Sequence, residues 1–197
     1  MLDRNYTWHL QSSNSVPYAY QKQFFSPTEC DAIIEYGLAQ APIESYVGED
    51  RYVDNNIRRN RVSFLRSVDQ ASHWIFDRIS SGVRSINQQF WNFDLQFIET
   101  LQFTRYDRDA DFYGAHVDLG YGRIEQRKLT FSIQLSDENI YTGSDLQFHN
   151  CGMNFYDSVR DRGTIIMFPS WVVHQVTPVT SGTRYSLVGW VIGPPFK

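Results

Sequence analysis

The sequence is poor in cysteine and in long apolar runs, and each shortage excludes a class of protein. Only Cys30 and Cys151 occur, too few for a disulfide framework or a cysteine-rich zinc site, so two free thiols in a reducing compartment are expected. No apolar run approaches the roughly 20 residues that cross a bilayer. Residues 1–11 are polar and of mixed charge, without the apolar centre of a signal peptide. The sequence therefore predicts a soluble, cytoplasmic protein with no membrane partner.

An excess of positive charge is also lacking. The formal net charge of −4 gives no global attraction for nucleic acid, which is an unlikely partner, although a local basic patch is not excluded. Of the 197 residues, 42% are apolar and 16% are aromatic, enough to bury a core within one domain. No internal repeat or linker divides the chain, so a single domain over residues 1–197 is expected.

Two helices are predicted in the first half of the chain. Ser26 begins the first as its N-cap, with proline next and Glu29 three residues after the cap, and the helix should end near Gln40. The second should run from a cap near Asp69 to about Trp91, with an apolar stripe at helical spacing.

The segments around these helices are less regular. Residues 1–25 are expected to form a strand or two, and residues 61–65 a short strand. Residues 42–60 follow neither the helical nor the strand period. A solvated surface loop and a lid over a bound substrate are both open interpretations of such a stretch.

After Asn92 the pattern becomes β. The predicted strands are 95–106, 115–118, 128–135, 145–150, 163–169, 174–176 and 185–191. Turn-forming groups separate them, including residues 141–144 and 180–182, and such spacing predicts an antiparallel sandwich or barrel. The expected fold is mainly β with N-terminal helices. Residues from about 1 to 92 should supply strands and supporting helices, and residues from about 93 to 197 a jelly-roll core.

The candidate chemistry centres on His116 and Asp118. Separated by one residue, their side chains share a face of an extended strand. His174, 56 residues after Asp118 on another strand pattern, can complete a set of two imidazoles and one carboxylate, which suits Fe(II) with open coordination positions. Arg184, ten residues further on, is a cation for an acidic cosubstrate.

Two strand patterns carry polar faces. Thr130, Ser132 and Gln134 alternate with apolar residues, and this polar face belongs either to a ligand-filled barrel interior or to a solvated surface. Arg184 shares a face with Ser186 and Trp190. If that face is buried, the guanidinium requires either a cosubstrate carboxylate or an internal Asp or Glu.

Four stretches carry a resemblance to a known family. They are residues 25–31 (FSPTECD), 101–118 (with LQFTRY and YGAHVD), 141–148 (YTGSDLQF) and 163–186. Over nearly the whole chain, the sequence resembles the 2-oxoglutarate/Fe(II) dioxygenases of the prolyl 4-hydroxylase-like branch. The resemblance implies a double-stranded β-helix, which agrees with the jelly roll.

The resemblance also implies roles for individual residues. His116, Asp118 and His174 match the iron ligands. The implied cosubstrate-binding residues are Arg184 and Tyr106, together with Thr130 and Gln134. The implied substrate-binding residues are Tyr113, Arg127, Trp190 and Glu99. Ser144 departs from the family pattern, in which a second glycine is usual, and Arg184 replaces the lysine of many collagen-type enzymes.

The implied activity is hydroxylation of a C–H bond with Fe(II), 2-oxoglutarate and O₂, supported by ascorbate. A prolyl residue in a peptide or protein is the expected substrate, and a free amino acid or other small molecule is the alternative. No Ser/His/Asp or paired-carboxylate constellation is present, as expected for chemistry that needs no catalytic group beyond the iron site. A non-catalytic jelly-roll binding module, with both histidines as ordinary polar residues, is the alternative of another class.

Overall fold

The computed structural model describes residues 16–44, 54–107, 110–120, 126–149 and 155–196. The described helices are α1 (Pro27–Ala39) and α2 (His73–Phe90), the latter preceded by a 3₁₀ turn, Gln70–Ser72. The described strands are β1 (Ala19–Gln21), β2 (Ile43–Glu44), β3 (Arg58–Arg59), β4 (Arg61–Leu65), β5 (Phe97–Ile98), β6 (Leu101–Tyr106), β7 (Phe112–His116), β8 (Gln126–Gln134), β9 (Tyr141–Gly143), β10 (Leu146–His149), β11 (Phe155–Asp157), β12 (Ile165–Pro169), β13 (His174–Val176), β14 (Val179–Gly182) and β15 (Arg184–Gly193).

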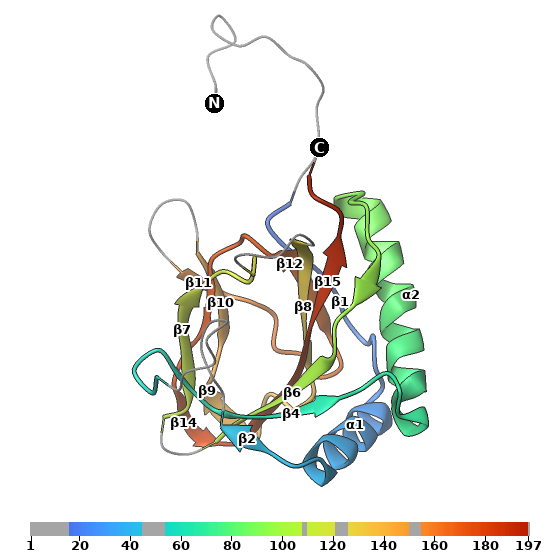
Figure 1. Cartoon of the computed structure of the whole chain (residues 1–197). Helices are drawn as coiled ribbons and strands as arrows, with labels where there is room; N and C mark the ends of the chain where they lie inside the picture. Colours follow the sequence, from blue (N-terminus) through green and yellow to red (C-terminus); the bar gives the residue numbers. More distant parts are fainter. Residues whose placement is uncertain (1–15, 45–53, 108–109, 121–125, 150–154, 197) are drawn as a thin grey trace, which may run out of the picture.

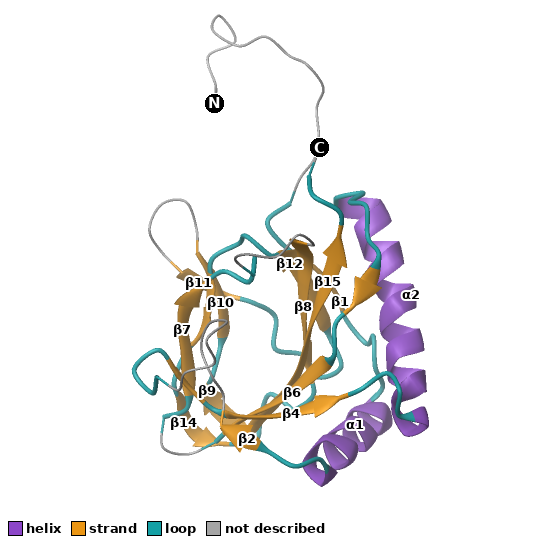
Figure 2. Ribbon diagram, viewed as in Figure 1, coloured by secondary structure: helices purple, strands orange, loops and turns teal. Residues whose placement is uncertain are grey.

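Two antiparallel sheets face each other across a common interior (Figures 1 and 2). The larger has the order β1-β12-β8-β15-β6-β4-β2, with β5 also paired to β15. The smaller has the order β11-β10-β13-β7-β3, and β14 and β9 form a separate ribbon. Both helices lie along the outer face of the larger sheet (Figure 2). The predicted mainly β jelly roll with N-terminal helices is confirmed.

The helices begin where their capping signals predict. At α1 the Ser26 hydroxyl accepts a hydrogen bond from the Glu29 backbone N–H at 3.2 Å, and the Glu29 carboxylate accepts one from the Ser26 N–H at 2.8 Å. This reciprocal pair satisfies two N–H groups that the first turn leaves free. Asp69 caps the 3₁₀ turn that leads into α2. On α2, Gly82 permits a close approach to Phe24, which lies between β1 and α1, because a Cβ there would lie 2.4 Å from the Phe24 ring.

The two faces of β8 are both buried. Leu129, Phe131 and Ile133 belong to the hydrophobic core between the larger sheet and the helices. Thr130 and Gln134, on the opposite face, are equally inaccessible to solvent. The polar face of this strand therefore lines the interior between the sheets, and the solvated-surface interpretation is wrong.

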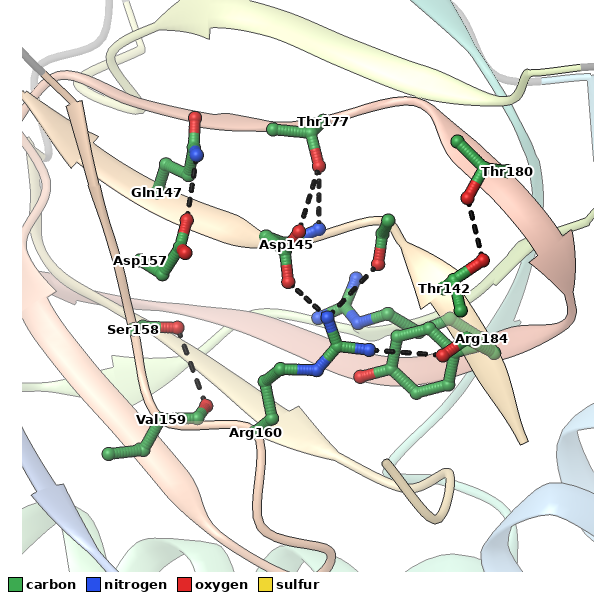
Figure 3. Close-up of polar contacts among 12 residues, drawn as sticks. Thr142, Asp145, Gln147, Asp157, Ser158, Val159, Arg160, Thr177, Thr180 and Arg184 are labelled. Atoms are coloured by element: carbon green, nitrogen blue, oxygen red, sulfur yellow. Dashed lines mark hydrogen bonds and ion pairs between the residues drawn. The ribbon is translucent and has the colours of Figure 1, made fainter. Parts of the chain in front are cut away.

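Several segments differ from the predictions. Residues 141–143 and 180–182, predicted as turns, lie in the β9–β14 ribbon, where the Thr142 hydroxyl is 2.6 Å from that of Thr180 (Figure 3). The irregular stretch 42–60 contains β2 and β3, which are too short for a period to be visible. Its residues 45–53, the centre of the predicted lid, lie outside the described residues. In the described part of the chain, no helix is long and apolar enough to cross a membrane.

Candidate metal and cosubstrate site

His116, Asp118 and His174 converge at one point in the interior. β13 pairs with β7, and this pairing sets His174 directly opposite His116. Asp118 lies two residues beyond the end of β7. The candidate ligand atoms of the three side chains lie within 4.8 Å of one another. The Asp118 carboxylate oxygens are 3.5 Å from His116 Nε2 and 3.4 Å from His174 Nε2.

Backbone carbonyls orient both imidazoles. His116 Nδ1 lies 2.8 Å from the Gly114 carbonyl oxygen, and His174 Nδ1 lies 2.9 Å from that of Val172. Nδ1 must carry the proton in both rings, which leaves the Nε2 lone pairs facing the carboxylate. Three electron-pair donors thus point at one another, an arrangement that a divalent cation between them stabilises. The donor set fits Fe(II) with open positions.

Electrostatics favour the protonation states that metal binding requires. Burial, with a further contribution from His174, lowers the pKa of His116 to about 3. Burial alone would raise the pKa of Asp118, but the neighbouring imidazoles outweigh it and hold that pKa below its usual range. At neutral pH the site therefore offers a neutral His116 and an ionised carboxylate.

Asp118 is held by contacts rather than by strand geometry. β7 ends at His116, so the prediction that both residues lie on one extended strand is wrong. The Asp118 N–H donates to the Ser170 carbonyl at 2.8 Å, and the Thr130 hydroxyl donates to Asp118 Oδ2 at 3.0 Å. The Ser170 hydroxyl lies 3.1 Å from that of Thr130. Thr130, a predicted cosubstrate contact, thus contacts a candidate ligand, and its cosubstrate role stays a prediction.

Arg184 lies deeper on the same interior. Its residue is only 1% exposed, and its Nε and Nη2 donate to Gln134 Oε1 at 3.1 and 2.8 Å. Its Nη1 has no hydrogen-bond partner, and no described carboxylate lies within 4.0 Å of the guanidinium. The internal acidic partner left open by the sequence is absent among the described residues. The buried cation therefore still lacks a matching anion.

Figure 3 shows why Asp145, the carboxylate drawn near Arg184, does not serve as that partner. Asp145 forms an ion pair with Arg160 and is also contacted by the Thr177 hydroxyl. Arg160 further donates to the Tyr141 carbonyl and lies over the Tyr141 ring, with its Cζ 4.4 Å from the centroid. Among the described residues, Asp145 therefore pairs with Arg160 and not with Arg184.

The spacing along β8 relates the two halves of the site. Thr130 contacts Asp118 and Gln134 contacts Arg184, and both project from the same face. They are four positions apart on the strand, so the two positions are roughly 13 Å apart along the backbone. Tyr106 pairs with Arg184 across β6 and β15, and its ring centroid lies 5.4 Å from the guanidinium carbon. Burial raises the pKa of Tyr106, so its hydroxyl keeps its proton.

Tyr113, a predicted substrate-binding residue, lies against the candidate metal ligands. Its ring stacks on His116 with centroids 3.6 Å apart and planes 18° apart. Burial raises the pKa of Tyr113 to about 12, so the phenol is neutral. The guanidinium carbon of Arg58, which is a buried residue of β3, lies 4.5 Å from the Tyr113 ring centroid. Sequence reasoning missed Arg58 as a residue near the site. Its only signal in the sequence was its place in a short group of arginines at positions 58, 59 and 61.

Glu99, Arg127 and Trp190, the other predicted substrate-binding residues, form a second group. Arg127 donates to both Glu99 carboxylate oxygens at 2.8 Å, and its guanidinium carbon lies 4.1 Å from the Trp190 ring centroid. The indole N–H of Trp190 lies near enough to Asp118 to lower its pKa but forms no hydrogen bond of ordinary geometry.

A β-bulge brings Arg127 to this position. On β15, Val191 pairs with Leu129 and Ile192 pairs with Arg127, so Lys128 has no residue opposite it. The extra residue shifts the alternation of faces, and Arg127 joins Trp190 instead of the helix-facing core. On the other side of β8, the Lys128 carbonyl accepts a hydrogen bond from the Ser170 N–H at 3.1 Å, which continues the pairing of β12 with β8. Sequence reasoning also missed Ser170, because its position depends on that long-range pairing.

Comparison with protein families agrees with this geometry. Residues 101–192, which include all three candidate metal ligands and Arg184, match the 2OG-Fe(II) oxygenase superfamily. This match covers 92 of the 197 residues, and over that segment the chain resembles the superfamily.

Individual proteins and solved structures also resemble the chain, either over part of its length or in fold. A PKHD-type hydroxylase of Synechococcus sp. (strain CC9605) is 40% identical over 82 residues, which are 42% of this chain and 37% of that relative. The chain thus matches well under two thirds of that relative's length. A prolyl-4-hydroxylase of Pseudomonas putida superposes with a TM-score of 0.70 at 18% identity, covering 91% of this chain and 94% of the other. A Trichoplax adhaerens prolyl hydroxylase, in complex with a hypoxia inducible factor peptide, gives 0.71 at 15% identity, covering 90% and 84%. At such identities the structural likeness shows the fold.

Proposed function

We propose that the chain is an Fe(II)- and 2-oxoglutarate-dependent dioxygenase that hydroxylates a prolyl residue of a peptide or protein. One observation carries the proposal: a His-Asp-His convergence and a buried guanidinium without an anion share one barrel interior. A metal alone does not account for the guanidinium, and an acid-binding site alone does not account for the three converging ligands. A dicarboxylate that reaches both does.

The residues would divide the work between two ends of the interior. His116, Asp118 and His174 would hold Fe(II), which with 2-oxoglutarate and O₂ supplies oxidation of an unactivated C–H bond coupled to decarboxylation of 2-oxoglutarate to succinate. Arg184 would bind the far carboxylate through two parallel N–H groups, with its unpartnered Nη1 among them. The protonated Tyr106 hydroxyl is a second donor for that carboxylate.

The surrounding residues fix positions and exclude water. Thr130 and the Ser170 carbonyl hold Asp118 in place for the metal. The buried interior gives Arg184 a low-dielectric setting, in which a charge-assisted hydrogen bond is stronger than in water. Tyr113 and Trp190, together with the Arg127–Glu99 pair, would surround the target residue next to the metal.

The choice of a prolyl substrate rests on support of another kind. The relative from Trichoplax is a prolyl hydroxylase seen with a peptide, and the Pseudomonas protein is a prolyl-4-hydroxylase. In this chain, neutral aromatic rings at Tyr113 and Trp190 suit an uncharged pyrrolidine ring. The Arg127–Glu99 pair is already charge-balanced, so it does not call for an ionic substrate there.

The first experiment tests the chemistry without a substrate. The protein is incubated with Fe(II), 2-oxoglutarate and ascorbate, and succinate is measured for the wild type, His174→Ala and His73→Ala, a control on an exposed helical histidine. The proposal expects slow succinate formation that is lost in His174→Ala and kept in His73→Ala. Equal background succinate formation in all three proteins would instead indicate a non-catalytic jelly-roll module.

The second experiment tests the substrate. Proline-containing peptides and free amino acids are offered in parallel, and +16 Da products are sought by mass spectrometry. Products on peptides support the prolyl assignment. Products on a free amino acid alone, or no peptide product despite brisk succinate formation, would overturn it.

A further inference from the structure

An aromatic cluster lies partly exposed at one end of the molecule, outside the site described above. Phe93, Trp171 and Phe196 contact one another pairwise, with ring centroids 5.4 to 5.6 Å apart. Trp171 is 41% exposed and Phe196 is 47% exposed. Figure 1 shows that β15, whose end leads to Phe196, and α2, whose end leads to Phe93, finish at the same end of the molecule. Exposed aromatic side chains gathered in this way are typical of interaction sites.

A buried lysine lies against this cluster. Lys128, the residue of the β8 bulge, is only 2% exposed, and its Nζ is 3.2 Å from the Phe196 ring centroid. Within the described part of the chain, its ammonium forms no hydrogen bond and has no carboxylate within 4.0 Å. The aromatic ring compensates only part of the cost of burying the charge, so the lysine favours an anion.

A small cavity joins the lysine to the aromatic rings. It has a volume of about 220 Å³ and is lined by Asn92, Phe93, Asp94, Lys128, Pro195 and Phe196. This volume is below the roughly 300–1,000 Å³ of pockets that enclose a whole drug-sized ligand. The cavity therefore suits one or two side chains of a larger ligand. The exposed Asp94 carboxylate raises the pKa of Lys128, but desolvation of the ammonium is the larger effect and lowers that pKa. We call the cavity and Trp171 together the aromatic cleft.

The aromatic cleft adjoins the candidate metal site through two short links. Trp171 precedes His174 by three residues, so their Cα atoms are at most about 11 Å apart. Ser170 receives the Asp118 N–H on its carbonyl and donates its own N–H to the Lys128 carbonyl. A polypeptide that occupies the cleft is thus close enough to continue to the metal site.

We propose that the aromatic cleft docks a second part of the substrate polypeptide, a proline-rich segment that carries an acidic residue for Lys128. The proposal rests on the proposed function and names its substrate class more closely. Aromatic-lined grooves bind polyproline II segments because these are stiff and lose little entropy on binding. A carboxylate from the segment would complete a charge-assisted pair with the buried ammonium.

The test uses labelled 15-residue peptides with a central proline, a proline-rich flank and a glutamate placed at successive flank positions, each with a glutamine counterpart. Binding is measured by fluorescence anisotropy on the full chain with Mn(II) and 2-oxoglutarate, so no turnover is needed. The peptide with glutamate at one of these positions is expected to bind at least about tenfold tighter than its glutamine counterpart, as for a charge-assisted hydrogen bond. Lys128→Met, which keeps the length of the side chain, should abolish that difference.

Two matched variants separate docking from general damage. Trp171→Ala is expected to weaken every 15-residue peptide about tenfold but to leave a three-residue prolyl peptide unaffected. Trp74→Ala removes a tryptophan of similar exposure, 39%, near the opposite end of α2. It should change the affinity of neither the 15-residue peptides nor the three-residue peptide. Succinate formation without peptide should be the same in all variants and the wild type.

The failures of the two proposals differ. The docking site would be overturned if glutamate peptides bind no better than glutamine peptides, even if hydroxylation occurs. It would also be overturned if Trp74→Ala and Trp171→Ala lose peptide affinity equally. Absent succinate formation with intact glutamate-selective binding would overturn the proposed function alone. A dimer in sedimentation that Trp171→Ala dissociates would assign the cleft to a second copy of the chain and overturn the peptide assignment.

Discussion

Replacing Arg184 by methionine should remove cosubstrate binding while leaving the free energy of unfolding almost unchanged. The substitution leaves Gln134 Oε1 without two donors, which costs about 1–3 kcal/mol. It also removes a buried charge whose Nη1 has no partner, and replacing buried ionic groups by apolar ones of similar volume is neutral or stabilising by about 1–4 kcal/mol. The two terms offset, so we expect a change of less than about 1 kcal/mol in the ligand-free protein.

Arg160→Met is the matched control, because Arg160 does have a carboxylate partner. Its loss removes the arginine donor from Asp145 Oδ1, on a side chain that is only 22% exposed, and from the Tyr141 carbonyl. The Thr177 hydroxyl still contacts Asp145 Oδ2. Breaking one partner from a fully buried pair costs about 3–5 kcal/mol, and partial exposure reduces this to about 2–3 kcal/mol. Of these two arginines, only Arg160 should therefore contribute measurably to the free energy of unfolding.

Denaturant unfolding with and without 2-oxoglutarate, using Mn(II) in place of Fe(II), measures both effects. At a 2-oxoglutarate concentration about 100 times Kd, the free energy of unfolding of the wild type and of Arg160→Met should each increase by about 2.7 kcal/mol. Loss of a bidentate charge-assisted contact weakens binding by about 100-fold or more, so Arg184→Met should gain only about 0.4 kcal/mol. An Arg184→Met protein that is as destabilised as Arg160→Met, or that keeps the full ligand gain, would refute the assignment of Arg184 to the cosubstrate.

Three further predictions follow from single contacts. Thr130→Val should weaken metal binding about 10- to 100-fold in a Mn(II) titration, because it removes the hydroxyl that orients a ligand carboxylate; unchanged affinity would exclude that role. Burial raises the pKa of the Cys30 thiol from 9.0 to about 11, so the folded chain keeps a proton that the unfolded chain loses between these values. The free energy of unfolding should then fall by up to about 2.7 kcal/mol as the pH rises from 9 to 11, and Cys30→Ala should remove this part of the slope. Gly82→Ala should destabilise the protein by about 1–3 kcal/mol in denaturant unfolding, since its Cβ would overlap the Phe24 ring, whereas the exposed Ser81→Ala should not.

The sequence predicted the elements whose signals are local. The capping residues located both helices, and the alternation in residues 128–135 identified two faces of β8. The same pattern did not say that both faces are buried, because that depends on the second sheet, which the chain reaches only through long-range pairing. Residues 141–143 and 180–182 have the composition of turns, and their pairing into a ribbon depends on hydroxyl contacts between distant segments.

The candidate site was predicted for reasons that hold only in part. His116 and Asp118 do converge, but through the contact of Asp118 with Ser170 and not through a shared strand. Arg184 is buried, which its period alone left open, and its amide neighbour Gln134 could not be predicted without the register of β15 on β8. The cytoplasmic location, the supporting role of ascorbate and the proline in the substrate stay predictions.

The extra residue at Lys128 separates Arg127, a proposed substrate contact, from Thr130, which contacts the candidate metal ligand Asp118. In an unbroken strand, any shift of Arg127 would be transmitted to Thr130 and from there to the metal ligands. The bulge interrupts the regular pairing between them. Leu129 packs in the hydrophobic core, whereas Arg127 forms an ion pair with Glu99. Replacing Arg127 is therefore expected to change the proposed substrate contacts without changing the contact of Thr130 with Asp118.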